Sequence, residues 1–151
     1  MRRLRICIVG GGFSGVTTAV RLLDGAKTPV HLTLIDGSSP VGRGVAYGVE
    51  STSLLLNVPA ARMGAMVEDE EQFYHFARTR DRRVSPADFL SRSMYGEYLG
   101  ELLSAAARRG TGAGHELNAL TDTAIAIEMD SDSRFHISLA SSSPLASFDA
   151  V

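Results

Sequence analysis

The sequence predicts an α/β fold built on a parallel sheet. An apolar run at 5–9 leads into a glycine-rich turn and a helical stretch, and a second apolar run follows at 29–35. A strand, a helix and a strand joined by short loops make a βαβ unit, whose two strands pair in parallel. The 151 residues are enough for one domain with its own core, so we expect a single domain over 1–151.

The first three elements follow from changes in the hydrophobic pattern. Residues 5–9 (RICIV) are apolar without alternation, which is typical of a parallel strand buried on both faces. From Gly15 the apolar residues share one broad helical face, made of Val16, Ala19, Val20, Leu22 and Leu23. The pair at 24–25, Asp-Gly, ends this helix. The second strand then runs over 29–35 and ends at Asp36.

The middle of the chain has one clear helix. Residues 37–65 show no sustained period, so we expect a long structured loop with at most one short strand. Residues 69–78 predict a helix with acidic residues in its first turn, and 86–89 predict a short helical turn. The clearest helix is 94–109, which we expect Gly110 to cap. Its apolar face consists of Tyr95, Tyr98, Leu99, Leu102, Leu103 and Ala106.

The last third of the chain predicts a β-meander. Runs at 119–129, 134–139 and 145–151 are separated by turns at 130–133 and 141–144. We expect residues 148–151 to begin a strand beside the first strand of the sheet. Because the sequence stops inside this apolar run, we expect it to be truncated, as the N-terminal portion of a longer protein whose second nucleotide or substrate domain is absent.

Composition excludes several classes of function. The net charge is −2, which argues against attraction to nucleic acid or to an anionic membrane. No apolar run approaches the ~20 residues that span a bilayer, and the short run after Arg2 and Arg3 does not resemble a signal peptide. The lone cysteine, Cys7, fits a reducing compartment. We therefore expect a cytoplasmic protein.

Metal, nucleophile and nucleic-acid sites are also disfavoured. The four histidines lie far apart in sequence, without the spacing of metal ligands, at His31, His75, His115 and His136. Ser14 lacks the motif that surrounds a nucleophilic serine. The arginines within 78–83 have no aromatic residues interleaved, so we interpret them as a solvated helix end rather than a nucleic-acid site.

The glycines after the first strand are typical of a dinucleotide site. Gly10 allows a tight turn, Gly12 lets the backbone approach a pyrophosphate, and Gly15 lets the helix pack closely on the strand. The N–H groups of the first helical turn then hold the phosphates. The candidate phosphate-binding residues are Gly10, Gly11, Gly12, Phe13, Ser14 and Gly15.

Asp36 completes this fingerprint. It follows Gly15 by 21 residues, close to the ~20 expected of a carboxylate that accepts hydrogen bonds from an adenosine ribose. The same carboxylate would repel the 2′-phosphate of NADP. The alternative is a purely structural turn with Asp36 capping a loop, and the fingerprint alone does not separate FAD from NAD.

Three further stretches lie outside the glycine turn: GRGVAY at 42–47, LLNVPA at 55–60 with Met63 soon after, and FLSRSMYGEYL at 89–99. In these stretches the chain resembles a family of FAD/NAD(P)-binding flavoproteins that includes FAD-dependent urate hydroxylases and aspartate N-monooxygenases. The resemblance spans essentially the whole chain. It implies a Rossmann-like parallel sheet of the glutathione-reductase type with a β-meander insertion.

The resemblance also implies roles for individual residues. The glycine turn would hold the FAD pyrophosphate, and Asp36 the adenosine ribose. Arg43 would lie along the phosphates or the ribityl chain, Asn57 and Val58 would approach the flavin ring, and the main chain at Ala124 would bind adenine. Arg43 is equally compatible with a solvated loop arginine, whereas ordinary core is the favoured interpretation of the leucines at 54–56.

The function implied is that of the FAD-binding part of an NAD(P)H-dependent flavoprotein oxidoreductase, a monooxygenase or hydroxylase of a small molecule. FAD is the expected cofactor and NAD(P)H the expected electron donor. The flavin carries the chemistry in such enzymes, so no catalytic residue is assigned. The alternative is a non-catalytic or NAD-only dinucleotide-binding fragment.

Overall fold

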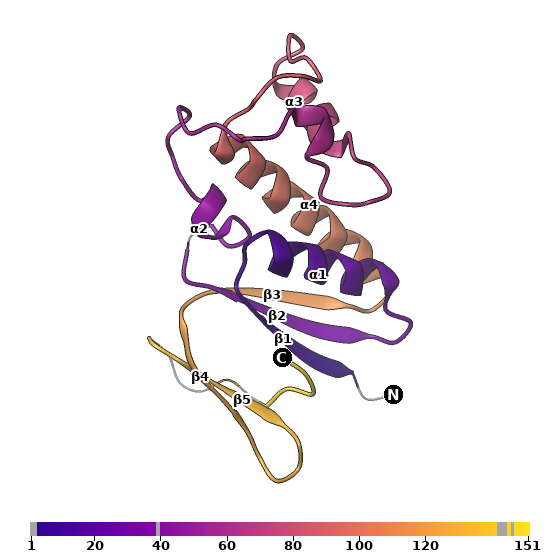
Figure 1. Cartoon of the computed structure of the whole chain (residues 1–151). Helices are drawn as coiled ribbons and strands as arrows, with labels where there is room; N and C mark the ends of the chain where they lie inside the picture. The colour runs from indigo at the N-terminus through magenta and orange to yellow at the C-terminus, as the bar shows by residue number, and fades with distance from the viewer. Residues whose placement is uncertain (1–2, 39, 142–144, 146) are drawn as a thin grey trace.

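The computed structural model describes residues 3–38, 40–141, 145 and 147–151, and it has the predicted mixed α/β architecture. Three layers are visible in Figure 1: helices α1 and α4, a parallel sheet, and an antiparallel hairpin on the other side of the sheet. In chain order the elements are β1 (Leu4–Val9), α1 (Phe13–Gly25), β2 (Val30–Asp36), α2 (Gly44–Tyr47), the 3₁₀ helix η1 (Ala60–Arg62), α3 (Gln72–Arg80), α4 (Arg92–Gly112), β3 (Glu116–Thr121), β4 (Ala124–Met129) and β5 (Phe135–Leu139).

The βαβ unit is confirmed. β1 pairs with β2 in parallel with Ile6 opposite Leu32, and β2 pairs with β3 in parallel, so the strand order is β1-β2-β3. β2 is the central strand and is almost entirely buried. On the other edge of β1, Ile6 forms a parallel bridge with Ala150, at the place where the sequence predicts a strand beside the first one.

The prediction of one strand over 119–129 is wrong, because the chain changes sheets inside that run. β3 continues the parallel sheet, whereas β4 pairs with β5 in the hairpin. The change occurs at Asp122, whose N–H donates to the Asp36 carbonyl at 3.1 Å and whose carboxylate accepts the N–H of Thr123 at 2.7 Å. These contacts turn the chain at 122–123, inside a run that the sequence predicts as a single strand.

The ends of the helices also differ from the predictions. α1 begins at Phe13, earlier than expected, and the acidic residues expected in the first turn of α3 precede that helix. α4 extends through Gly112, so Gly110 lies inside it and does not cap it. Gly110 is buried there, and a Cβ on it would lie 3.2 Å from Leu23 Cδ2, so the lack of a side chain lets α4 pack closely against α1. Residues 86–89 form no helix.

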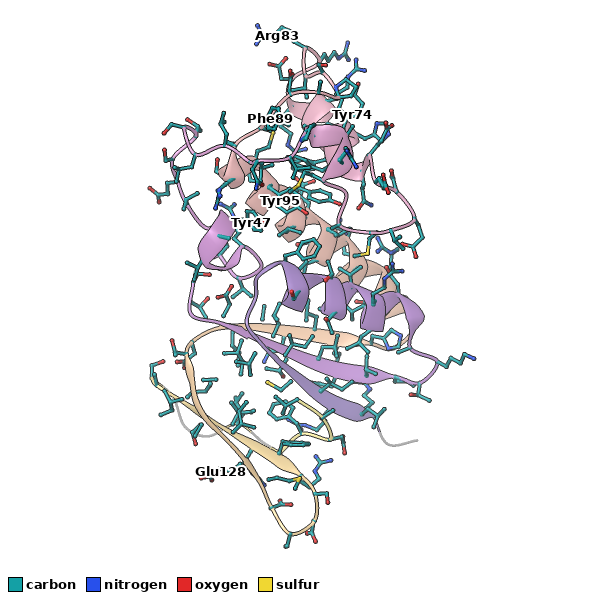
Figure 2. The ribbon with its side chains drawn as sticks, in the orientation of Figure 1. Tyr47, Tyr74, Arg83, Phe89, Tyr95 and Glu128 are labelled. Atoms are coloured by element: carbon teal, nitrogen blue, oxygen red, sulfur yellow. The ribbon has the colours of Figure 1, made fainter. Side chains whose placement is uncertain are left out.

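Each face of the sheet has its own hydrophobic core. The larger core lies between the sheet and the helices and includes a group of aromatic rings on α3 and α4, among them Phe73 and Tyr95. Figure 2 shows Tyr47, Tyr74 and Tyr95 on this helical side and Glu128 on the distant hairpin. The smaller core joins the sheet to the hairpin and consists of Cys7, Ile35, Ile137, Leu139 and Phe148.

The last described segment joins the hairpin to β1. Phe148 exchanges two backbone hydrogen bonds with Phe135, and the N–H of Asp149 donates to the Arg5 carbonyl at 2.7 Å. The Asp149 carboxylate accepts the Arg5 N–H at 2.8 Å and forms an ion pair with Arg134. The expected turn at 141–144 lies largely outside the described residues.

The described residues provide neither a membrane-spanning helix nor a metal-binding cluster. No helix there combines the length and the apolar character needed to cross a bilayer. No three histidine, cysteine or acidic side chains gather there in a group that could hold a metal ion.

Candidate functional site

The glycine turn packs the start of α1 against the end of β1. Gly10 has a φ of +104° and donates its N–H to the Ile35 carbonyl of β2 at 2.8 Å, a conformation that favours glycine. A Cβ on Gly15 would lie 1.9 Å from the Gly10 carbonyl oxygen. Only glycine therefore permits this approach of helix and strand, as the sequence predicts for the last glycine of the fingerprint.

The N-terminus of α1 is open. Gly12 is the N-cap and has no side chain to accept the first helical N–H groups. The helical bonds begin with the Val16 N–H, which donates to the Gly12 carbonyl at 2.9 Å, so the preceding amides have no partner within the helix. The atom nearest to a Cβ built on Gly12 would be Gly44 Cα, at 3.9 Å. This turn therefore offers donors, a favourable helix dipole and free space, which together suit a phosphate.

Asp36 ends β2 directly beside this turn. The residue is only 8% exposed, and its Oδ1 accepts the Ser38 N–H at 3.2 Å. Its Oδ2 is buried and has no hydrogen-bond partner among the described residues. A Cβ on Gly11 would lie 2.4 Å from this Oδ2, so Gly11 is needed to admit the carboxylate. An unpaired buried carboxylate oxygen is unfavourable, and a ligand hydroxyl would relieve it.

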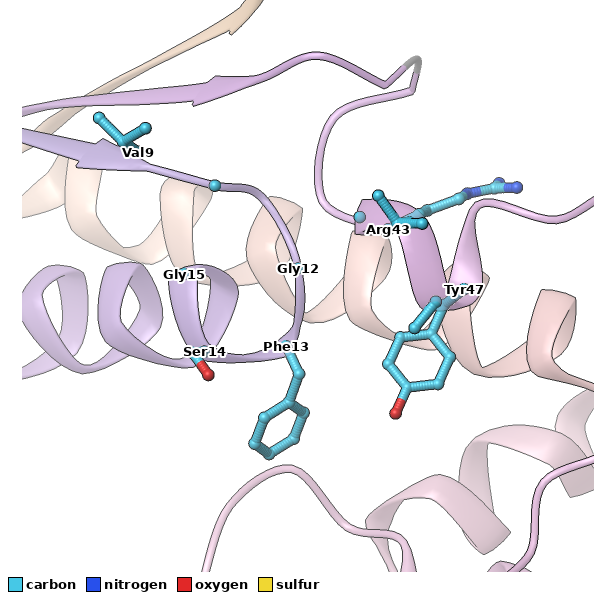
Figure 3. Close-up of a pocket in the computed structure, with 11 residues that line it drawn as sticks. Val9, Gly12, Phe13, Ser14, Gly15, Arg43 and Tyr47 are labelled. Carbon is cyan, nitrogen blue, oxygen red and sulfur yellow. The ribbon is translucent and has the colours of Figure 1, made fainter. Parts of the chain in front are cut away.

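A cavity of about 400 Å³ opens at the turn (Figure 3). Of the predicted residues it is lined by Gly10, Gly12, Phe13, Ser14, Gly15 and Arg43. It is also lined by Gly44 and Tyr47 of α2, to which the sequence assigns no individual role although both belong to the GRGVAY stretch. Gly44 has a φ of +58°, and a Cβ there would lie 2.6 Å from Gly12 Cα. This close contact between two glycines allows α2 to pack against the glycine turn.

Arg43 lies at the edge of this cavity. Figure 3 shows its side chain extending away from the glycine turn. Its Cδ lies 3.3 Å from the position of a Cβ on Gly96 of α4, and it also lines a second cavity together with Glu97 and Glu101. It has no ion-pair partner among the described residues. Both interpretations of Arg43, phosphate ligand and solvated arginine, therefore stay open.

Asn57 and Val58 do not line the cavity at the turn. They lie in the loop before η1, where Asn57 is exposed and Val58 is half-buried. The three leucines before them differ in burial. Leu56 is 5% exposed, as expected of a core residue, whereas Leu54 and Leu55 are 49% and 53% exposed and do not belong to the core. A contact between Asn57 or Val58 and a flavin ring remains a prediction.

Ala124 begins β4 immediately after the turn at 122–123. That turn contacts the end of β2, because the Asp122 N–H donates to the Asp36 carbonyl at 3.1 Å. The structure thus brings Ala124 to the same end of the sheet as Asp36. This placement is compatible with the predicted main-chain contact to adenine, which remains a prediction.

Comparisons with known proteins agree with this geometry. Residues 7–151 match the model of a family described as FAD-NAD(P)-binding. The S-allyl-L-cysteine S-oxygenase from Allium sativum is similar in structure, with a TM-score of 0.66 and 16% identity, over 99% of this chain and 35% of that one. The tetrameric form of 2-methyl-3-hydroxypyridine-5-carboxylic acid oxygenase has a TM-score of 0.54 and 14% identity, over 97% of this chain and 38% of that one.

The two similarities establish the fold. The chain spans little more than a third of the length of either oxygenase. No curated protein sequence matches it.

Proposed function

The chain belongs to the FAD-NAD(P)-binding family, and from that membership we propose that residues 1–151 form the FAD-binding domain of an NAD(P)H-dependent flavoprotein oxidoreductase. We further propose that the complete enzyme is a monooxygenase of a small molecule. The two similar structures support this proposal, since both are named as oxygenases of small molecules, one of S-allyl-L-cysteine and the other of a hydroxypyridine carboxylic acid.

One observation carries the proposal: two unsatisfied sets of polar groups lie on either side of the same turn. The N–H groups that open α1 face the free space in front of Gly12. The buried Oδ2 of Asp36 lies against Gly11. The first set is suited to a pyrophosphate, and the second to a ribose hydroxyl. A dinucleotide carries both groups on one molecule.

The residues of this chain bind and orient the nucleotide. The α1 amides and the helix dipole hold the phosphates, and Asp36 accepts a hydrogen bond from a ribose hydroxyl and thereby fixes the adenosine end. When bound, FAD supplies the chemistry of accepting a hydride and reacting with oxygen.

The second candidate is a domain that binds NAD without catalysis. Asp36 suits the ribose of NAD as well as that of FAD, and the family is described by both nucleotides. The two candidates differ in which nucleotide the protein retains. Against NAD alone stands the similarity to two oxygenases.

The test is to purify the chain, record its visible absorption, and identify the nucleotide released by heat on a chromatography column. We expect flavin absorption and released FAD, or tight binding when FAD is titrated into colourless protein. Under anaerobic conditions we expect NADH or NADPH to bleach the flavin of the longer enzyme. Binding of NAD with no binding of FAD would refute the proposal and favour the second candidate.

A further inference from the structure

A further cavity, distinct from the one beside Glu97 and Glu101, adjoins the cavity at the glycine turn. It has a volume of about 260 Å³ and is lined by Phe13, Tyr47, Arg62, Met63, Gly64 and Tyr95. Phe13 and Tyr47 line both cavities. Figure 3 shows their two rings projecting to the same side of the chain, one from the start of α1 and the other from the end of α2. A ligand here would lie next to the proposed nucleotide site.

Hydrogen bonds fix the backbone at Gly64, which lines this cavity, and at the adjoining Ala65. The Gly64 N–H donates to the Glu70 carbonyl at 2.8 Å, and the Ala65 N–H donates to the Tyr98 hydroxyl at 2.9 Å. A Cβ on Gly64 would lie 2.2 Å from the Asp69 carbonyl oxygen. Because the backbone at 64–65 is held in this way, the cavity is preformed and binding requires little ordering of the protein.

The cavity walls combine aromatic rings with two polar groups. Tyr47 and Tyr95 meet edge to face with their centroids 4.8 Å apart, and such rings accept a further aromatic ring well. Tyr95 is only 1% exposed and its hydroxyl has no hydrogen-bond partner among the described residues. Burial raises the pKa of Tyr95, and the neighbouring Tyr98 and Tyr47 raise it further, so the hydroxyl keeps its proton and acts as a hydrogen-bond donor.

Arg62 supplies the charge. It is the only charged residue among the six that line the cavity. It is exposed and forms no ion pair with any other residue that the structure describes. A guanidinium group recognises a carboxylate through two parallel hydrogen bonds. The cavity volume lies just below the roughly 300–1,000 Å³ of pockets for drug-sized ligands, which suits one substituted ring and excludes a dinucleotide.

We propose that this cavity binds a planar aromatic ring that carries a carboxylate, and that such a compound is the substrate of the oxygenase. The ring would pack against Phe13, Tyr47 and Tyr95, and the carboxylate would bind Arg62. Calling the ligand a substrate rests on the proposed function, whereas the binding of an aromatic carboxylate does not.

The test measures the binding of two probes, benzoate and the uncharged benzamide, by titration calorimetry with the chain, and measures FAD affinity separately. We expect benzoate to bind at least about tenfold more tightly than benzamide, the factor for one charge-assisted hydrogen bond. Arg62→Gln should remove that difference without changing FAD affinity. Arg82→Gln is the matched control, since Arg82 is exposed and lines none of the cavities described above. Tyr95→Phe should weaken benzoate several-fold and leave the melting temperature near that of the parent.

The outcomes separate the two proposals. If Arg62→Gln and Arg82→Gln bind benzoate equally well, or if benzoate does not bind, the cavity is not a carboxylate site. If Arg62→Gln weakens FAD instead, the cavity belongs to the flavin, and the substrate assignment fails while the FAD proposal stands. If benzoate binds as expected and FAD does not bind, the aromatic carboxylate site stands and the proposed function fails.

Discussion

Two loops of this molecule each lead into a helix, yet only one of them leaves the helix end open. Gly12 and Pro59 are both N-caps with extended backbone, before α1 and η1 respectively. At η1 the first amides are occupied, because the Ala60 N–H donates to the Asp88 carbonyl at 2.9 Å and the Ala61 N–H to the Pro86 carbonyl at 3.1 Å. At α1 the corresponding amides face a cavity. A helix start becomes an anion site only where the fold leaves its donors unpaired.

The open N-terminus of α1 depends first on the close contact of α1 with β1, which Gly15 permits. We expect Gly15→Ala to destabilise the protein by about 4 kcal/mol or more, because the new Cβ would overlap the Gly10 carbonyl oxygen. Gly25→Ala is the matched control at the other end of α1, where a Cβ would meet no atom within 4 Å. It should change stability by less than about 1 kcal/mol. Urea denaturation followed by circular dichroism measures both. Similar midpoints for the two variants would contradict the packing described for Gly15.

The open end of α1 can be closed without disturbing the fold. Gly12→Val should abolish nucleotide binding, because the isopropyl group would fill the free space in front of the first helical amides. The thermal melt without nucleotide should stay close to that of the parent. A folded variant that still titrates with FAD like the parent would place the phosphates elsewhere.

Substitution of Asp36 tests whether its carboxylate binds a ligand or only caps a loop. We expect Asp36→Ala to weaken FAD by about 1–3 kcal/mol, the range for losing a charge-assisted hydrogen bond. Because Oδ2 is buried without a partner among the described residues, the substitution should leave the stability of the nucleotide-free protein unchanged or slightly higher. Calorimetry and a thermal melt on the same samples separate the two effects. A loss of stability with unchanged FAD affinity would make Asp36 purely structural.

The smallest effect on FAD affinity is expected for a substitution in the loop before η1. Asn57 is exposed and does not line the cavity at the turn, so Asn57→Ala should change FAD affinity by less than about 0.5 kcal/mol, as for an ordinary surface substitution. Titration of both proteins with FAD tests this. A tenfold loss would instead support the flavin contact that the resemblance implies.

The glycine turn is predictable from the sequence because steric requirements restrict which residue types can occupy its positions. Gly10 needs a positive φ, Gly15 admits a carbonyl oxygen, and Asp36 follows at a spacing fixed by the βαβ unit. Each requirement acts on the residue type itself. The placement of these residues around one turn was therefore predictable from spacing alone.

Other features depend on contacts between distant segments and were not predictable in this way. The break between β3 and β4 depends on the hydrogen bond from Asp122 to Asp36, which links residues far apart in sequence. Gly110 lies within α4 rather than capping it, and a Cβ there would lie 3.2 Å from Leu23 Cδ2 of α1, a neighbour that the local sequence does not identify. Gly44 and Gly12 lie in two stretches that the sequence assigns to the nucleotide site. Neither stretch contains a pattern that predicts their contact with each other.

The hydrogen bond from the Arg5 N–H to the Asp149 carboxylate has a consequence for the order in which the molecule folds. The two residues are separated by 144 positions, so forming this contact closes nearly the whole chain into a loop, at an entropic cost that local pairs avoid. The pairing of β1 with β2 spans far less chain and can form first. We therefore expect the glycine turn to form before residues 147–151 dock beside β1 and give that strand its second neighbour.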